Sequence, residues 1–525
     1  MNQSFTLFNV ARRYFTTLAL IINGMFATAQ PSVQWQKTYG GTGNEGIQSL
    51  RQTADSGYIL ACYTTSNDSD VSGNHGGGDA WIVKTNANGV IQWRKTLGGT
   101  NYDYPIMISE TNNGFLLTGQ TNSNNGTIAT ANHGAGDAWV LKLDDTGGTV
   151  WQKVLGGSSW DFGNSITPTS DHGCIMTGGT YSSDGDVSGL HGAGDVWVVK
   201  FDSSGNIQWN KTYGGTDDDW GFTIKQTFEG GYIVAASTAS NNGDVTSNHG
   251  SQDAWIIKLN DTGAISWQKT YGGSNFEQAL PIVQTSDSGY IFSGETYSND
   301  GDISANHGGW DYWLVKINAT GTLVWEKTYG GTNDDLPTYM QQTGDGGFIL
   351  GGFTASNSGD VTGNHGPDDM WVVKTNDTGY MQWEKCFGGT GNDTANCIIQ
   401  TFDGGYAIAG ATTSHNGDIT QNRGGEDCWL VKLNATTGVP TIKNNADDIK
   451  VYPVVSDGMV YIELPEARKQ AQIRLMNLDG QALPVQELSG GLTHSLQLSN
   501  IPPAMYIIQV IDKDRINSFR IIYHP

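Results

Sequence analysis

The stretch Asp253-Ala-Trp255-Ile-Ile-Lys258, followed by Trp267-Gln-Lys269 and Gly272-Gly273, is one copy of a unit that repeats every 58 residues. The first tryptophan of the unit recurs with this step at Trp81, Trp139, Trp197, Trp255, Trp313, Trp371 and Trp429. The second recurs with the same step at Trp35, Trp93, Trp151, Trp209, Trp267, Trp325 and Trp383. A period of this length sustained over seven copies predicts seven like structural units that pack on one another.

Each unit divides into four short runs that read as β-strands. In the second unit these runs are Pro105–Thr111, Phe115–Thr121, Ala138–Leu143 and Thr149–Lys153. They carry β-branched or aromatic residues and are bounded by Gly, Asn and Asp. Four antiparallel strands in a unit of this size are typical of a propeller blade. We therefore predict an all-β fold, with a seven-bladed β-propeller over residues 30–440.

The two ends of the repeat array fit together. The first copy begins only at the tryptophan-bearing strand, Val33–Tyr39, and the seventh ends after Asp427–Leu433. Where the next second-position tryptophan would be due, the chain has Thr441. We expect the N-terminal strand to complete the last blade, because this closes the ring and removes an exposed sheet edge.

The composition suits such a fold and excludes one class of partner. Charged residues make up only 15% of the chain, and there are 72 glycines. This mix favours short strands and tight turns over helices. Asp and Glu number 52 against 28 Lys and Arg, for a net charge of −24. A surface this acidic repels phosphate backbones, so we expect no nucleic-acid partner.

The five cysteines do not follow the repeat: they are Cys62, Cys174, Cys386, Cys397 and Cys428. A disulfide framework in a repeat protein should recur with the repeat, so we interpret them as buried thiols. A Cys386–Cys397 bridge is the one pairing that stays open at this point.

Residues 1–29 have the layout of a signal peptide. Arg12 and Arg13 precede an apolar run from Tyr14 to Phe26, and Ala27-Thr-Ala29 forms a small-residue cleavage site. The apolar run is too short and too interrupted to span a bilayer. The sequence therefore predicts export, with no transmembrane span in the mature chain.

After a short polar linker, residues 441–447, the repeat disappears. Residues 448–525 show alternating strand-like runs, and about 78 residues of that kind suit a small Ig-like β-sandwich. The runs are Ile449–Tyr452, Met459–Leu464, Ala471–Met476, His494–Leu498, Tyr506–Ile511 and Ser518–Tyr523.

Two family resemblances follow from these residues. The segment Asp-x-Trp-x-x-Lys, a Gly turn and a Trp strand resemble the repeats of quinoprotein-like and related bacterial propellers, which implies a fold but no particular activity. Val451-Tyr-Pro453, Asn477-Leu-Asp-Gly480, Met505-Tyr-Ile-Ile508 and Arg520-Ile-Ile-Tyr523 resemble the C-terminal sorting domain of type IX secretion substrates.

The second resemblance has consequences for location. It implies that residues 448–525 are recognised by the type IX secretion machinery. It also implies that the protein is secreted by, or attached to the outer surface of, a Gram-negative bacterium. Two positions depart from the family pattern: Tyr452-Pro-Val-Val455 replaces the usual Tyr-Pro-Asn-Pro, and Ala504 replaces a common Gly. A generic Ig-like module is the alternative.

An acid lies ten residues after each second tryptophan: Glu45, Asp103, Asp161, Asp219, Glu277, Asp335 and Asp393. If the tryptophan strand is outermost in its blade, these acids lie near the mouth of the central channel. Seven carboxylates there would form an acidic rim that attracts cations or basic groups. The alternative, which we favour, is that each acid caps a turn or accepts backbone N–H groups between blades.

A polar loop such as Ser298-Asn-Asp-Gly-Asp302 supplies a second repeated acid, at Asp70, Asp186, Asp244, Asp302, Asp360 and Asp418, with Thr127 in the second copy. Oxygen ligands around a Gly turn suit calcium, the one cofactor that the sequence suggests. The loop lacks the full ligand series of an EF-hand, and an Asx turn explains it equally well.

A third repeated feature is His-Gly-x-x-Asp-x-Trp, with His75, His133, His191, His249, His307 and His365, and with Arg423 in the seventh copy. Histidine beside a carboxylate is suggestive of acid–base catalysis. Six near-identical pairs instead favour a hydrogen-bonded link that every blade needs.

No nucleophile elbow, phosphate loop or zinc-binding histidine pair is present in the sequence, and no catalytic residue is assigned. The leading hypothesis is a secreted or cell-surface binding module whose partners are glycans or surface proteins. The alternatives are a polysaccharide-degrading enzyme, with acids from separate blades, and an outer-membrane structural component. Four aromatic residues that depart from the repeat would form a sugar platform: Trp160, Trp220, Phe276 and Trp310.

Overall fold

The computed structural model describes residues 30–130, 132–435 and eight strands between 450 and 523. The predicted signal peptide, residues 1–29, and the predicted linker, residues 441–447, lie outside the described residues. Within the described part of the chain, no helix has the length and apolarity needed to cross a membrane.

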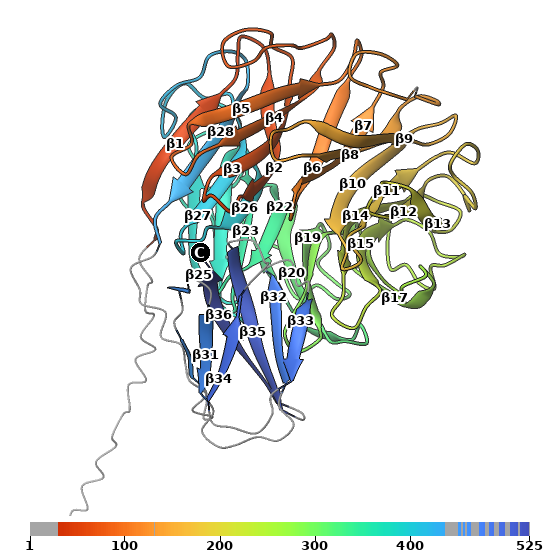
Figure 1. Ribbon diagram of the computed structural model, residues 1–525, viewed down its shortest axis with the longest axis vertical. Coiled ribbons are helices and arrows are strands. Elements are labelled where there is room, and N and C mark those ends of the chain that lie inside the picture. Colours follow the sequence, from red (N-terminus) through yellow and green to blue (C-terminus); the bar gives the residue numbers. More distant parts are fainter. Residues whose placement is uncertain are drawn as a thin grey trace, which may run out of the picture.

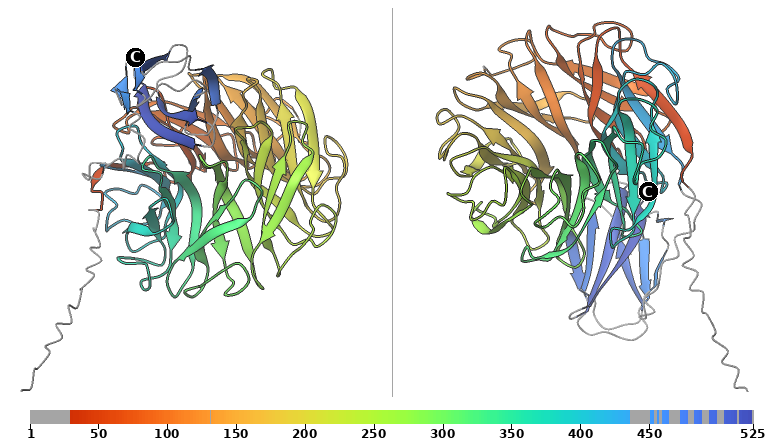
Figure 2. Two further views of the ribbon diagram at one scale, coloured as in Figure 1. Left: turned by 90° about the horizontal axis from the view of Figure 1, so that it is seen from below. Right: turned by 180° about the vertical axis from the view of Figure 1, so that it is seen from behind.

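Seven four-stranded antiparallel sheets follow one another around a common axis (Figures 1 and 2). Blade 1 contains β2 (Glu45–Gln52), β3 (Tyr58–Thr64), β4 (Asp79–Thr85) and β5 (Ile91–Leu97). Blade 2 contains β6 (Asp103–Thr111), β7 (Gly114–Thr121), β8 (Asp137–Leu143) and β9 (Thr149–Leu155). Blade 3 contains β10 (Asp161–Pro168), β11 (Cys174–Thr180), β12 (Asp195–Phe201) and β13 (Ile207–Tyr213).

The same order continues in the other blades. Blade 4 contains β14 (Asp219–Gln226), β15 (Tyr232–Thr238), β16 (Asp253–Leu259) and β17 (Ile265–Tyr271). Blade 5 contains β18 (Glu277–Gln284), β19 (Tyr290–Thr296), β20 (Asp311–Ile317) and β21 (Leu323–Tyr329). Blade 6 contains β22 (Asp335–Gln342), β23 (Phe348–Thr354), β24 (Asp369–Thr375) and β25 (Met381–Phe387). The predicted seven-bladed propeller is confirmed.

Blade 7 closes the ring. It contains β26 (Asp393–Gln400), β27 (Tyr406–Thr412), β28 (Asp427–Leu433) and the N-terminal strand β1 (Val33–Tyr39). Strand β1 pairs antiparallel with β28, with Thr38 opposite Trp429, and Figure 1 shows the red β1 beside the light-blue β28. The predicted closure by the N-terminal strand is therefore confirmed.

The first strand of every blade lies against the first strands of its two neighbours, so these strands line the axis and the fourth strands are outermost. The two repeated tryptophans then have different surroundings. The first, such as Trp197, is fully buried between blades, where it packs with Ile166 and Met176. The second, such as Trp151, covers the hairpin of the next blade.

The glycine at that hairpin is required by the tryptophan. Gly205 has a φ of +78°, and a Cβ added to it would lie 2.6 Å from the ring of Trp151. The same contact joins Gly263 to Trp209 and Gly321 to Trp267. The hairpin glycine and the second tryptophan of the repeat thus recur together because they contact each other between neighbouring blades.

The lysine of Asp-x-Trp-x-x-Lys is buried and is paired with an acid in six of the seven blades. In blade 3, Lys200 Nζ lies 2.7 Å from Asp171. In blade 2 the equivalent of the acid is Asn113. Among the described residues, Lys142 donates hydrogen bonds only to the Thr111 hydroxyl and the Asn113 backbone carbonyl. Burial lowers the pKa of Lys142 to about 8.

Replacing Asn113 with aspartate should therefore raise the pKa of Lys142 and stabilise the protein by about 0.5–1 kcal/mol at pH 7. In the wild type, unfolding takes up a proton at Lys142 between its lowered pKa and the ordinary value of 10.5, so stability contributed by this group rises with pH across that window. Urea unfolding at pH 7 and pH 9.5 measures both effects. Asp171→Asn is the matched control, which should destabilise the protein at pH 7; an unchanged pH dependence in Asn113→Asp would contradict the prediction.

The C-terminal domain consists of two sheets. One contains β29 (Lys450–Tyr452), β31 (Met459–Glu463) and β34 (Thr493–Gln497), and the other has the order β30 (Val455–Ser456), β36 (Arg515–Tyr523), β35 (Ala504–Asp512), β32 (Gln472–Asn477) and β33 (Ala482–Glu487). Val460 of the first sheet and Ile473 of the second share one core cluster, as a sandwich requires. Strands β30 and β33 were not predicted; β33 contains Pro484, which its place at the sheet edge tolerates.

Candidate functional site

The repeated acid is the first residue of each inner strand, and it is buried. The Asp161 carboxylate accepts hydrogen bonds from the Gly157 N–H at 2.8 Å, from the Ser182 hydroxyl at 2.7 Å and from the Thr180 hydroxyl. In every blade the acid accepts the N–H of the second glycine of the preceding Gly-Gly pair: Gly41, Gly99, Gly157, Gly215, Gly273, Gly331 and Gly389.

These bonds bear on the two interpretations of the acids. Glu45, Asp103, Asp161, Asp219, Glu277, Asp335 and Asp393 are at most 1% exposed. Each is the first residue of an inner strand, and its side chain is buried within the blade. Their hydrogen bonds to backbone N–H groups match the alternative, in which the acid holds the turn between one blade and the next.

The histidine–aspartate pairs are also part of the framework. Asp195 is buried, and it accepts the backbone N–H of His191 at 2.9 Å and its Nδ1 at 2.6 Å. The same two bonds recur at the other five histidines, and Arg423 donates its backbone N–H to Asp427 at 2.8 Å. Burial raises the pKa of each aspartate, to about 6 for Asp427.

The second set of acids has equally local partners. Asp302 accepts the Gly272 N–H at 3.2 Å, and its own N–H donates to the Gly272 carbonyl at 3.0 Å. The same backbone N–H bonds recur at Asp70, Asp186, Asp244, Asp360 and Asp418, and Thr127 uses its hydroxyl. Among the residues that the structure describes, no group of three or more His, Cys, Asp or Glu side chains is placed to hold a metal ion.

The residues next to the buried acids differ from blade to blade. All seven inner strands begin at the same end of the ring, which we call the mouth. Residues just before the acids are held there by backbone bridges between blades, such as Gly136 to Trp160 and Gln252 to Phe276. The mouth is thus a rigid frame that carries side chains which the repeat does not require.

Aromatic side chains gather on one part of this frame. Trp160 is 48% exposed and stacks on Tyr181, with ring centroids 6.4 Å apart and an interplanar angle of 14°. The indole N–H of Trp220 donates to the Tyr181 hydroxyl at 3.0 Å. Trp160 also contacts Phe162, at 5.6 Å. Blades 3 and 4 therefore share one aromatic group.

Blade 5 carries a second group. Trp310 contacts Phe276, with ring centroids 4.9 Å apart, and Tyr297, at 5.2 Å. Tyr63 and Tyr104 form a stacked pair on blades 1 and 2. We call these residues the aromatic arc: Tyr63, Tyr104, Trp160, Phe162, Tyr181, Trp220, Phe276, Tyr297 and Trp310. It includes the four aromatic residues predicted from the sequence, and it adds the residues that contact them and the separate Tyr63–Tyr104 pair.

Near Trp310, the mouth also carries three carboxyl groups at positions where most other blades have no acid. The backbone N–H of Trp310 donates to Asp334 Oδ1 at 3.1 Å. Glu295 is only 7% exposed, and burial raises its pKa to about 7, with a smaller contribution from Asp334. Burial and Asp334 also raise the pKa of Asp368. Sequence reasoning did not single out these three acids, although Glu295 stands where other blades have Tyr, Gln, Gly, Ser, Phe or Ala.

Comparison with known proteins gives one family match and several fold-level likenesses. Residues 450–524 match the family "Secretion system C-terminal sorting domain". This confirms the resemblance noted in the sequence, and the domain implies recognition by the type IX secretion machinery, with secretion or attachment at the outer surface.

Likenesses over the propeller are weaker. The regulatory protein FlaEY of Caulobacter vibrioides is 25% identical over 212 residues, which cover 37% of this chain and only 22% of that protein. The extracellular domain of the putative one-component system BT4673 from B. thetaiotaomicron is 13% identical, with a TM-score of 0.39, over 94% of this chain and 58% of that one. Cobalt-substituted Synechocystis ACO is 12% identical, with a TM-score of 0.35, over 78% and 96%. At these values the likenesses say nothing about activity.

Proposed function

We propose that this seven-bladed β-propeller, which carries a C-terminal sorting domain of the type IX secretion system, is a secreted or cell-surface binding module that holds glycans at its mouth. The observation that carries the proposal is the aromatic arc. Its rings are partly exposed and pack against one another in groups, and bridges between the blades hold the backbone that carries them.

The propeller fold does not require the residues of the aromatic arc, because they do not recur from blade to blade. A residue that the ring needs recurs in every blade, as the buried acids and the first tryptophans do. The mouth-facing position of Trp160 is instead occupied by Asn, Tyr, Asp or Phe in the other blades. Exposed aromatic side chains that gather on one face of a folded domain mark a binding site, and an indole or phenol ring offers an apolar face with a polar edge.

The charge at the mouth narrows the ligand class. Asp334, Asp368 and Glu426 border the arc, and the whole chain has a net charge of −24. Anionic polysaccharides would be repelled by this field. The aromatic faces and carboxylates together suit neutral glycans or glycans that carry amino groups.

The test is binding of the protein to a panel of neutral, amino-bearing and anionic polysaccharides, measured by affinity electrophoresis. Trp160→Ala and Trp310→Ala should each weaken binding about tenfold, the effect of losing about 1.4 kcal/mol of ring contact, with the melting temperature unchanged. Tyr380→Ala is the matched control, because Tyr380 is also an exposed aromatic residue but lies in the β24–β25 hairpin at the other end of the ring. Unaltered binding by both tryptophan variants, or preference for the anionic polysaccharides, would overturn the proposal.

Glu295 supports a second candidate, a polysaccharide-degrading enzyme on the same site. A carboxyl group whose pKa is about 7 is partly protonated at neutral pH, as a general acid must be. Asp334, which contacts Trp310, is the nearby carboxylate. In this case Glu295→Gln should abolish release of reducing sugar from the bound polysaccharide while leaving its affinity intact. If the wild type releases none, the binding role stands alone.

A further inference from the structure

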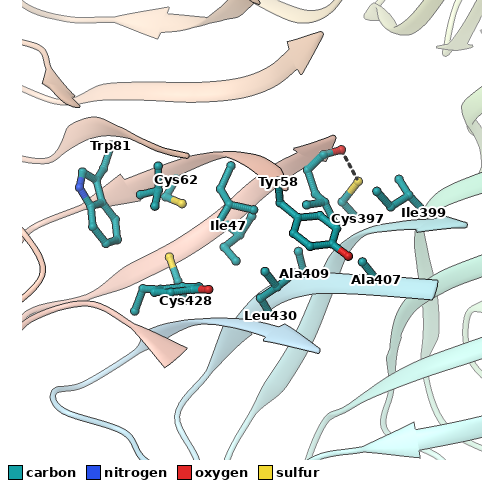
Figure 3. Packing of buried hydrophobic residues seen from close by; sticks show 14 of the residues in the cluster. Ile47, Tyr58, Cys62, Trp81, Cys397, Ile399, Ala407, Ala409, Cys428 and Leu430 are labelled. Carbon is teal, nitrogen blue, oxygen red and sulfur yellow. Dashed lines mark hydrogen bonds between the residues drawn. The ribbon is translucent and has the colours of Figure 1, made fainter. Parts of the chain in front are cut away.

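Two cysteines face each other at the junction between blade 1 and blade 7, next to the strand pair that closes the ring. Cys62 lies in β3 of blade 1, and Cys428 lies in β28 of blade 7. Both are 0% exposed and belong to the same core cluster. Their sulfur atoms point toward each other in Figure 3, where Cys397 lies at the far end of the cluster. The structure records all five cysteines as unbonded thiols.

The position of this pair in the fold is specific. Cys62 is paired across its blade with the first tryptophan, and Cys428 directly precedes the first tryptophan of the neighbouring blade. At the other six junctions the equivalent pairs are Gly119 and Ala80, Gly178 and Ala138, Ala236 and Val196, Gly294 and Ala254, Gly352 and Tyr312, and Gly410 and Met370. Only the closing junction has a cysteine on both sides.

These equivalents show that the two positions adjoin one another between blades. A Cβ added to Gly352 would lie 2.5 Å from the hydroxyl of Tyr312, and Ala236 shares a core cluster with Val196. In the sequence, Cys62 and Cys428 occupy different places in the 58-residue unit, so no periodicity relates them. They meet only because the ring closes.

Closure is also where a covalent bond would matter most. Blade 7 is completed by β1, whose pairing with β28 is held by hydrogen bonds and packing alone. The chain leads from β1 through β2 directly into β3, which carries Cys62. A bond from Cys62 to Cys428 would therefore join β28 covalently to blade 1, which the chain already connects to β1 through β2, so that β1 and β28 could not separate.

We propose that Cys62 and Cys428 form a disulfide in the exported protein and that this bond locks the ring. The two thiols lose two protons and two electrons as the S–S bond forms. The electron acceptor is the disulfide of a thiol–disulfide oxidoreductase in the exporting compartment, which is reduced to a dithiol. The proposal rests on export, which the sorting domain implies, and is independent of the ligand at the mouth.

Burial determines when the bond forms. Complete burial, together with the neighbouring Cys62, raises the pKa of Cys428 well above its ordinary value. Few thiolates are then available for exchange in the closed ring, so the bond forms as blades 1 and 7 come together. Once the ring is closed, external reductants reach neither sulfur, because both side chains lie out of contact with solvent.

The test uses the mature protein recovered after export. Free thiols are alkylated in denaturant without reductant, the protein is then reduced, and the newly released thiols are labelled with a second, heavier reagent before peptide mass spectrometry. We expect the second label on Cys62 and Cys428 and the first label on Cys174, Cys386 and Cys397. The first label on Cys62 and Cys428, or a different cysteine pair carrying the second label, overturns the proposal.

A stability measurement gives an independent readout. Unfolding in denaturant with reductant present should lower the transition midpoint of the wild type, and it should leave the midpoint of a Cys62→Ala, Cys428→Ala double variant unchanged. Cys174→Ala is the matched control, since Cys174 is buried in the core of blades 2 and 3, and it should keep the full effect of the reductant. An equal midpoint for the wild type with and without reductant contradicts the proposal.

Discussion

Replacing Trp197 with alanine is expected to lower the free energy of unfolding by about 3–5 kcal/mol. The side chain is 0% exposed and lies in the core cluster that joins blades 2 and 3, with Ile166, Met176 and Val140 around it. Truncation leaves a cavity between two sheets that are fixed by their own hydrogen bonds and cannot collapse onto it. Urea unfolding followed by far-UV circular dichroism measures the loss.

The matched control is Trp209→Ala, in the same blade. Trp209 is only half-buried, because it packs over the Gly263 hairpin at the outside of the ring. Its loss should cost clearly less than the loss of Trp197. Equal effects of the two substitutions would mean that the first tryptophan is not the core residue of the repeat.

Replacing Asp161 with alanine should destabilise the protein by about 3 kcal/mol or more. The variant keeps the Gly157 N–H and the Thr180 and Ser182 hydroxyls buried but removes the carboxylate that accepts all three. A buried donor without an acceptor costs the free energy of the hydration that it has lost. The cost of leaving three such donors unpaired exceeds what the variant gains by no longer burying a carboxylate. The measurement is again urea unfolding, compared with the wild type at the same pH.

Asp161→Asn tests the same contact more gently. The amide keeps one acceptor oxygen, so we expect the free energy of unfolding of Asp161→Asn to lie between that of the wild type and that of Asp161→Ala. If instead Asp161→Ala were as stable as the wild type, the acid would not hold the blade junction, and the repeated acids would need another explanation.

The sequence alone sufficed for the architecture because the repeat samples each structural position seven times. The predicted strands Val33–Tyr39 and Asp427–Leu433 match β1 and β28 to the residue. In blade 2 the predicted strands differ from β6–β9 by two residues or fewer at each end. A single copy would have left these boundaries uncertain, since Gly, Asn and Asp also occur within the loops.

The sequence could not predict contacts between residues that occupy different positions in the 58-residue repeat. The acids were expected in the loops near the channel mouth. Their burial depends on Thr180 and Ser182, which come from the next strand and the loop after it. Cys62 and Cys428 meet only across the closing seam. In the C-terminal domain, Pro484 concealed an edge strand.

Some residues of the candidate site could likewise be predicted from the sequence, and others only from the structure. Trp160, Trp220, Phe276 and Trp310 could be found because each breaks the repeat with an aromatic residue. Tyr181 and Tyr297, on which they pack, depart from the repeat as well, but only the structure shows that they touch the tryptophans. The raised pKa of Glu295 results from burial, which the sequence does not reveal.

The most direct test of the binding role is hydrogen exchange of the whole mature protein with and without the oligosaccharide that binds best. Protection should appear in peptides that cover residues 158–162, 218–222, 274–278 and 308–312, which form the mouth. Exchange in the hairpins at the other end of the ring, residues 86–90 and 202–206, should not change. Protection confined to those hairpins, or none at the mouth under saturating ligand, would contradict the account.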